Sequence, residues 1–229
     1  MRLEDGIASD TGPGDPGVGM TSRRTRQRLR RRLEAAGIRN PEVLDLLGRL
    51  PRHRFVDEAL SSRAYEDSAL PIGHGQTISQ PYTVARMTEA LLEPARPRTV
   101  LEIGTGSGFQ TAVLASLVRR VYSVERVSAL LETARERLRE LRLRNVRLRH
   151  GDGGLGWPDY APFDAILVTA APEGIPRVLI NQLAIGGCMV LPIGQGVEQV
   201  LVRVIRTEQG YQHEILEPVT FVPLLAGLA

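Results

Sequence analysis

Residues 100–109 constrain the fold of this 229-residue chain more than any other segment. Their sequence, Val-Leu-Glu-Ile-Gly-Thr-Gly-Ser-Gly-Phe, predicts a buried strand, a glycine-rich turn and the start of a helix. Glycine adopts backbone conformations that other residues avoid, and it lets the main chain come close to a bound nucleotide. The segment therefore predicts a nucleotide-like ligand at the carboxyl end of a parallel strand.

Strand-like and helix-like segments alternate along the chain after Arg98. Such alternation, with strands that are apolar on both faces, is typical of a parallel sheet covered by helices. We therefore predict an α/β, Rossmann-like fold with a mostly parallel sheet, helices on both faces and a C-terminal antiparallel hairpin. The predicted strands are 99–103, 120–125, 146–150, 163–169, 187–192, 199–206 and 211–217, and the predicted helices are 108–118, 127–141 and 175–183.

The chain divides into three predicted parts. Residues 1–20 have too little apolar content to pack, so they are predicted to be a disordered extension. Residues 21–80 are predicted to form an N-terminal helical segment followed by a polar loop that serves substrate and cofactor. Residues 81–229 are predicted to form the main domain.

Arginine is concentrated in residues 23–32, where seven of the ten residues are Arg. Thr21 or Ser22 can cap a helix through this run, and Gly37 can close it. The run suggests a nucleic-acid contact, but Leu29 is its only apolar residue and no aromatic side chain is present to stack on bases. A solvated helix face is the preferred interpretation. All 29 basic residues of the chain are Arg, which excludes lysine-based chemistry.

Nothing in the sequence indicates export or membrane insertion. The N-terminus lacks a basic start followed by an apolar run, and the single Cys188 suits a reducing compartment. Residues 178–197 carry no charge, but Asn, Gln, Gly and Pro interrupt them, so a helix end, a turn and a buried strand are expected. We predict a cytoplasmic protein without membrane contact, and we expect Cys188 to be buried.

The glycine turn itself leaves two classes of ligand open. The spacing of Gly104, Gly106 and Gly108 resembles the dinucleotide fingerprint, but that motif needs Gly or Ala at the next position, where this chain has Phe109. Glu102, a further candidate for cofactor binding, gives instead the Leu-Glu-Ile-Gly pattern common in methyltransferases that depend on S-adenosylmethionine. The glycines would then let the chain turn beneath the amino-acid portion of that cofactor.

Two further strand ends carry candidate cofactor ligands. Glu125 ends the strand 120–125, where a carboxylate can accept hydrogen bonds from both ribose hydroxyls. Asp152 follows the strand 146–150 and can accept from the adenine amino group, while Gly153 lets its backbone come close. Both carboxylates can also be ordinary turn residues. Because ligands collect at the carboxyl edge of such sheets, the three strand ends together favour S-adenosyl-L-methionine as cofactor.

Several segments, in order, resemble the protein-L-isoaspartate O-methyltransferase family of bacterial type. The resemblance implies the S-adenosylmethionine-dependent methyltransferase fold and methylation of the carboxylate of L-isoaspartyl residues in damaged proteins and peptides. The ester would collapse to a succinimide, whose hydrolysis returns some normal aspartate. The segments that carry the resemblance are 73–82 (Gly-His-Gly-Gln-Thr-Ile-Ser-Gln-Pro-Tyr), 100–109, 151–153, 161–171 and 221–224 (Phe-Val-Pro-Leu), within a match over about residues 25–225.

The resemblance places the active-site residue at Ser79. There its hydroxyl would hold the substrate carboxylate without protonating it. The same resemblance places a cofactor-contacting loop at Gln76, Thr77, Ile78 and Ser79. Taken without the resemblance, Ser79 reads more simply as an N-cap of the helix that follows.

The chain departs from the family pattern at two points. Phe109 stands where the family usually has Tyr, which removes a hydroxyl. Some relatives have a longer C-terminal tail with further cofactor or substrate contacts. This sequence ends at Ala229, so those contacts are not carried over.

Three other functions are weighed against this one. A methyltransferase acting on RNA or a small molecule would use the arginine run, but it gains nothing from residues 76–81. A nicotinamide-dependent oxidoreductase is opposed by Phe109 and by the lack of a Tyr/Lys pair. A catalytically silent cofactor-binding scaffold is opposed by the intact Ser79 loop. We expect a monomer that acts on isoaspartyl proteins and peptides rather than nucleic acid, and no metal site.

Overall fold

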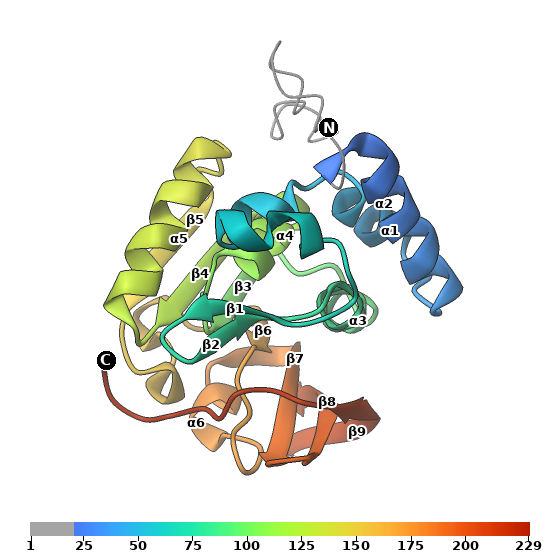
Figure 1. Cartoon of the computed structure of the whole chain (residues 1–229). Helices are drawn as coiled ribbons and strands as arrows, with labels where there is room; N and C mark the ends of the chain where they lie inside the picture. Colours follow the sequence, from blue (N-terminus) through green and yellow to red (C-terminus); the bar gives the residue numbers. More distant parts are fainter. Residues whose placement is uncertain (1–20) are drawn as a thin grey trace.

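The computed structural model describes residues 21–229, so the predicted disordered extension lies outside the described residues. Its centre is a seven-stranded sheet with the strand order β5-β4-β3-β6-β7-β8-β9 (Figure 1). The strands are β3 (Thr99–Ile103), β4 (Arg120–Glu125), β5 (Val146–His150), β6 (Phe163–Val168), β7 (Leu183–Gln195), β8 (Glu198–Thr207) and β9 (Gly210–Val219).

The strand directions confirm the predicted mixed sheet. Strands β3 to β7 pair in parallel, whereas β7, β8 and β9 pair antiparallel. The chain runs outward from β3 to β5 and then returns to place β6 on the other side of β3. Ligands of such sheets bind at this reversal, outside the carboxyl ends of the strands.

Helices and short 3-10 turns cover the sheet. A large hydrophobic cluster joins one face to α1–α5, and a smaller cluster on the other face lies under α6 and Trp157. Cys188 belongs to the large cluster and is buried as predicted, and burial raises the pKa of its thiol to about 12. The helices are α1 (Arg23–Ala35), α2 (Pro41–Leu47), α3 (Pro81–Leu92), α4 (Phe109–Leu117), α5 (Ser128–Glu140) and α6 (Arg177–Ile180), with 3-10 turns η2 (Arg52–Phe55), η3 (Glu58–Arg63), η4 (Gly153–Leu155) and η5 (Pro158–Tyr160).

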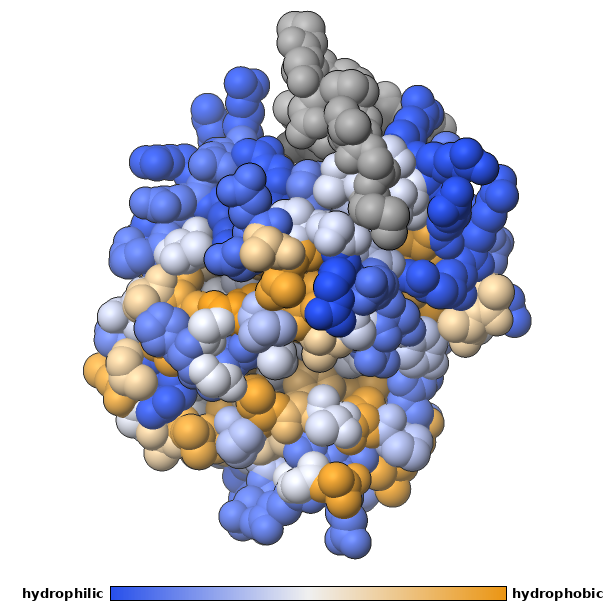
Figure 2. All heavy atoms as spheres, in the orientation of Figure 1, coloured by the Kyte–Doolittle hydropathy of each residue, from blue (hydrophilic) through white to orange (hydrophobic). Residues whose placement is uncertain are grey.

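The arginine-rich helix α1 packs on the rest of the molecule through one stripe. Leu29 and Leu33 are almost fully buried, and the Ser22 hydroxyl accepts from the Thr25 amide as the expected N-cap. Hydrophilic side chains gather on the surface around α1 and α5 (Figure 2). Within residues 21–229, none of the helices is long and apolar enough to span a membrane.

Two segments differ from the sequence prediction. The predicted polar loop is instead largely a β-hairpin of β1 (Leu70–Gly73) and β2 (Gln76–Ile78), because His74 and Gly75 both adopt positive φ and form a two-residue turn. The last predicted parallel strand is longer than expected, and β7 begins at Leu183 with an irregular register beside β6.

The two edge strands of the sheet are β9 and β5, and β5 pairs only with β4. Its Arg147 and Arg149 are exposed. Their guanidinium groups lie over the rings of Tyr160 and Trp157, at 4.9 and 5.5 Å from the ring centroids. The β5 edge of the sheet is therefore lined with positive charge.

Candidate active site

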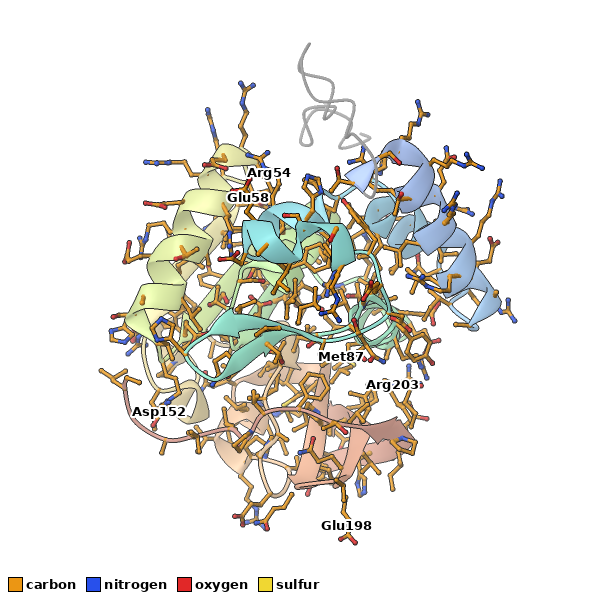
Figure 3. All side chains as sticks on the ribbon, in the orientation of Figure 1. Arg54, Glu58, Met87, Asp152, Glu198 and Arg203 are labelled. Atoms are coloured by element: carbon orange, nitrogen blue, oxygen red, sulfur yellow. The ribbon has the colours of Figure 1, made fainter. Side chains whose placement is uncertain are left out.

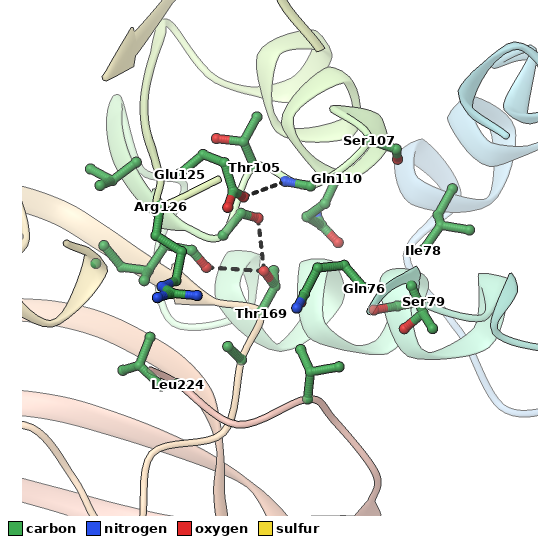
Figure 4. Close-up of a pocket in the computed structure, with 18 of the residues that line it drawn as sticks. Gln76, Ile78, Ser79, Thr105, Ser107, Gln110, Glu125, Arg126, Thr169 and Leu224 are labelled. Atoms are coloured by element: carbon green, nitrogen blue, oxygen red, sulfur yellow. Dashed lines mark hydrogen bonds between the residues drawn. The ribbon is translucent and has the colours of Figure 1, made fainter. Parts of the chain in front are cut away.

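A pocket opens where the sheet reverses, at the carboxyl ends of β3, β4 and β6. The empty space between its walls, with the solvent at its open mouth included, is about 850 Å³. In Figure 4, Gln76 and Ser79 lie on one side of it and Glu125 and Arg126 on the other. The lining segments are 76–79, 103–107, 109–110, 124–126, 153, 169–170 and 222–225, with Val84.

The glycine turn after β3 forms the floor of the pocket. Gly104 has a φ of +94°, and a Cβ there would lie 2.3 Å from Oγ1 of Thr169. That hydroxyl is fixed in place, because it donates to the carbonyl oxygens of Ile103 at 3.0 Å and Gly104 at 2.8 Å. Only glycine fits here, and its bare backbone faces the pocket.

Glu125 joins the end of β4 to the glycine turn. Its Oε2 accepts from the Gly106 amide at 2.8 Å, and its Oε1 accepts from the Val127 amide at 3.0 Å. Each carboxylate oxygen has a second lone pair, so Glu125 can still accept hydrogen bonds from hydroxyls of a ligand. The carboxylate thus stands where the sequence prediction needs a ribose acceptor.

Glu102 lies behind the pocket rather than in its lining. It is fully buried, and its Oε2 accepts from the hydroxyls of Thr111 and Ser123, each at 2.5 Å. Burial raises its pKa to about 8, which keeps the carboxyl largely protonated at neutral pH. Ser123 bonds in turn to Thr105 at 2.7 Å. Glu102 therefore reaches the glycine turn only through this chain of hydroxyls.

Ser79 lies at the end of the β1–β2 hairpin and lines the pocket. The N-cap of α3 is Gln80, whose own side chain makes no capping hydrogen bond, and Oδ1 of Asp67 accepts from the Tyr82 amide in the first turn at 2.9 Å. Ser79 is therefore not the N-cap of α3, which was its alternative role. Its carbonyl oxygen accepts from Nη2 of Arg52 at 2.8 Å, which ties the main chain of Ser79 to the buried side of the molecule.

The C-terminal segment, residues 220–229, crosses the carboxyl edge of the sheet and ends beside α5 (Figure 1). It is anchored to the loop after β6, since the Ala171 amide donates to Val222 at 2.8 Å and the Leu224 amide donates to Ala171 at 2.8 Å. Nearer its end, the Gly227 amide donates to Oδ2 of Asp152 at 2.7 Å. This segment covers the pocket from the solvent side.

Eight of the eleven predicted site residues line the pocket, and three do not. Gly108 is the N-cap of α4, and Glu102 is buried beneath the turn. Asp152 lies at the rim, where its Oδ1 accepts from the Gly154 amide and its Oδ2 accepts from the Gly227 amide. The eight are Gln76, Thr77, Ile78, Ser79, Gly104, Gly106, Glu125 and Gly153.

Sequence reasoning missed part of the lining. Arg126 and Thr169 directly follow strands β4 and β6, so the rule of strand ends would have found them. Gln110 and residues 222–225 carry no such local signal. Residues 221–224 were noted only as part of the family resemblance, without a role at the site, and the structure places 222–225 in the pocket lining.

The residues present fit a nucleoside with an attached amino acid. The turn offers bare backbone, Glu125 offers acceptor oxygens, and Gly153 has no room for a side chain, because a Cβ would lie 2.5 Å from Cγ2 of Ile103. Phe109 is buried and packs edge-on against Phe55, so the close helix approach of a dinucleotide site is absent. No group of metal-binding side chains occurs among residues 21–229. Fold and site together define the class of S-adenosylmethionine-dependent methyltransferases.

Comparisons with known proteins narrow this class. The family model for Protein-L-isoaspartate(D-aspartate) O-methyltransferase (PCMT) matches residues 24–229. Proteins named protein-L-isoaspartate O-methyltransferase from Marinobacter nauticus and Halorhodospira halophila are each 59% identical to this chain, with 93% and 92% of it covered and 96% of each relative.

Solved structures agree. A protein-L-isoaspartate O-methyltransferase structure from Plasmodium falciparum, in complex with S-adenosyl-L-homocysteine, has a TM-score of 0.77 at 26% identity, covering 87% of this chain and 98% of that one. A second structure of that name has a TM-score of 0.80 at 27% identity, covering 89% and 67%. The chain belongs to the protein-L-isoaspartate O-methyltransferase family.

Proposed function

We propose that the pocket between the Ser79 hairpin and the glycine turn is the site at which this enzyme methylates isoaspartyl carboxylates. As a member of its family, the chain transfers a methyl group from S-adenosylmethionine to L-isoaspartyl residues of damaged proteins and so initiates their repair. The observation that carries the proposed site is the meeting of Ser79, Gly104, Gly106 and Glu125 around one pocket.

The proposed roles divide between the two sides of the pocket. The glycine turn, Glu125 and Gly153 hold the cofactor, with Glu125 on the ribose. Gln76, Thr77 and Ile78 close the same space from the hairpin side. Asp152 and Glu102 support the cofactor site from outside the lining, Asp152 by anchoring Gly227 and Glu102 through the hydroxyls beneath the turn.

The chemistry requires positioning rather than a strong base. S-adenosylmethionine supplies an electrophilic methyl group when bound. The acceptor carboxylate is already ionised at neutral pH, since its reference pKa is about 4. The Ser79 hydroxyl donates a hydrogen bond that holds this carboxylate in line without protonating it. Correct alignment of two reacting groups can account for roughly 7–11 kcal/mol of a barrier.

The test of this function is a methyl-transfer assay on one peptide in its isoaspartyl and aspartyl forms. The isoaspartyl form is expected to be methylated strongly and the aspartyl form weakly or not at all. Equal methylation of both forms would contradict the proposed acceptor.

Ser79→Ala tests the site within that assay. Losing a hydrogen bond to a charged group costs about 1.5–3 kcal/mol, so turnover should fall about tenfold or more. The affinity for S-adenosyl-L-homocysteine, measured by calorimetry, should stay at the wild-type value. Ser68→Ala, on the neighbouring loop and outside the pocket lining, is the matched control. Unchanged turnover in Ser79→Ala would reject the role of this hydroxyl.

We further propose that the enzyme acts as a cytoplasmic monomer and that α1 is a packing helix rather than a nucleic-acid contact. Arg30 pairs with Asp45 at 2.8 Å and with Glu34 at 3.1 Å, and Arg32 donates to the Tyr65 carbonyl. These contacts support a structural use for the arginines. Sedimentation would test the monomeric state. A nucleic-acid binding titration at physiological salt would test the role of α1, and tight binding would contradict it.

A further inference from the structure

Arg52 is a fully buried arginine at the start of η2 (Arg52–Phe55). Its Nε donates to the carbonyl oxygen of Ala64 at 2.7 Å, and its Nη2 donates to that of Ser79 at 2.8 Å. The guanidinium carbon lies 4.9 Å from the ring centroid of Phe109, the first residue of α4. One side chain thus joins the η3 turn, the end of the hairpin and the start of the helix behind the glycine turn.

The carboxylate of Asp67 interacts electrostatically with the charge of Arg52, but the two side chains form no ion pair. Within residues 21–229 Arg52 forms no ion pair with a carboxylate, and its buried Nη1 has no hydrogen-bond partner. A buried charge without a counter-ion is costly, and an apolar side chain of similar volume would often be no less stable. Stability alone therefore does not explain an arginine at this position.

The location of the charge suggests its use. Ser79 and Phe109 both line the pocket, and Arg52 lies directly behind both of them. Burial lowers the pKa of the guanidinium to about 9, so it keeps its charge at neutral pH. A carboxylate held by the Ser79 hydroxyl would interact with this charge across the Ser79 residue itself, and a charge buried in protein is screened less than one in water.

We propose that Arg52 is the positioning residue of the methyl-acceptor side: it fixes the main chain of Ser79, and its buried charge makes the pocket favour a carboxylate over a neutral group. This inference rests on the proposed acceptor site. Arg52 does not touch the substrate, and it acts through Ser79 and through its electrostatic field. The buried charge then attracts the substrate carboxylate from behind Ser79, without direct contact.

The test compares two peptides that differ in charge at the acceptor group. One contains L-isoaspartate, and the other contains isoasparagine, in which the free carboxylate is an amide. Binding of each is measured by calorimetry to the full chain saturated with S-adenosyl-L-homocysteine. The wild-type protein should bind the carboxylate peptide at least about tenfold more tightly than the amide, in keeping with a charged hydrogen bond.

The variants separate charge from packing. Arg52→Met removes the charge and should reduce this preference at least about fivefold. If Arg52→Met does not fold, Arg52→Gln also removes the charge and should show the same reduced preference. Arg54→Gln is the matched control, since Arg54 lies on the same turn but is exposed, and its side chain is directed to Glu140 of α5 (Figure 3).

The acceptor and donor sides are read out separately. Affinity for S-adenosyl-L-homocysteine should be unchanged in every variant, and the kcat losses of Arg52→Met and Ser79→Ala should be less than additive, because both act on one contact. A wild-type preference for the carboxylate in Arg52→Met or Arg52→Gln would overturn the inference. A wild-type enzyme that does not distinguish isoaspartyl from aspartyl peptides would instead refute the proposed function.

Discussion

The glycine turn and the C-terminal segment line the same pocket but are held in different ways. The turn is buried, with Thr105 and Ser107 about 3% and 4% exposed, and side chains of β3, β4 and α4 fix it from below. The C-terminal segment is mostly exposed, with Leu225 and Leu228 about 47% and 59% exposed. It is held chiefly by backbone hydrogen bonds to distant loops.

The turn side of the pocket is therefore fixed by packing, whereas the C-terminal side is held in place by hydrogen bonds. Substitutions in the turn have to displace packed neighbours, so their effects should be large. Substitutions that release the C-terminal segment break single exposed hydrogen bonds, and these contribute less. Substitutions of four residues, two in or beneath the turn and two at its rim, test this ranking.

Gly104→Ala should have the largest effect. Its positive φ and the 2.3 Å approach to Oγ1 of Thr169 leave no room for a methyl group. Backbone strain and displacement of Thr169 should together cost about 3 kcal/mol or more, which is roughly a hundredfold loss of affinity for S-adenosyl-L-homocysteine by calorimetry. Gly174→Ala, where a Cβ meets nothing within 4 Å, should bind like wild type. Wild-type affinity for S-adenosyl-L-homocysteine in Gly104→Ala would contradict the conclusion that packing fixes the turn.

Glu102→Gln tests the buried layer under the turn through pH. Burial raises the pKa of Glu102 from 4.5 to about 8, so between these values the folded protein holds a proton that the unfolded chain releases. The stabilisation from this group is therefore complete below pH 4.5 and declines as pH rises to about 8. Between pH 4.5 and 8, urea unfolding should show the wild type losing on the order of 5 kcal/mol of stability relative to Glu102→Gln. Parallel pH curves for the two proteins would contradict the buried protonated state.

Glu125→Ala should weaken cofactor binding to an intermediate degree. The change removes the acceptor of the Gly106 and Val127 amides together with the proposed ribose contact. The expected cost is about 1.5–3 kcal/mol, or a tenfold to hundredfold rise in the dissociation constant of S-adenosyl-L-homocysteine. Glu132→Ala, an exposed change on the following helix, is the control. An unaltered constant for Glu125→Ala would place the ribose contact elsewhere.

Asp152→Ala should have the smallest effect. It removes the acceptor of the Gly227 amide at the exposed rim (Figure 3), which contributes about 1 kcal/mol. Hydrogen exchange at Gly227 should quicken, while affinity for S-adenosyl-L-homocysteine falls less than tenfold. A loss as large as that of Glu125→Ala would show that Asp152 contacts the ligand directly and would sharpen the boundary between the two sides.

The same contrast explains how far the sequence could be interpreted. The glycine turn, Glu125 and the strand pattern are local features, and their predicted places are confirmed by β3, α4 and β4. The C-terminal contacts depend on chain path, since Gly227 meets Asp152 across seventy-five residues. No periodicity reports such a meeting. Arg52 was missed for the same reason, because an arginine before a polar stretch gives no sign that it will be buried.

Glu102 was a different kind of error in reasoning. Its place before the glycines marks the motif, and the sequence prediction assigned it to cofactor binding. Alternation along β3 directs its side chain into the layer with Thr111 and Ser123, where the structure buries it completely. The alternation of side chains along a strand predicts this direction for Glu102, but the sequence prediction followed the motif instead.

The arginines on the free edge of β5 carry a consequence for a protein that handles damaged chains. An open sheet edge offers unpaired amides and carbonyls to any extended segment, and ageing proteins expose such segments. Arg147 and Arg149, each laid over an aromatic ring, keep this border charged and well hydrated. A charged edge strand of this kind disfavours pairing with an extended segment of another chain.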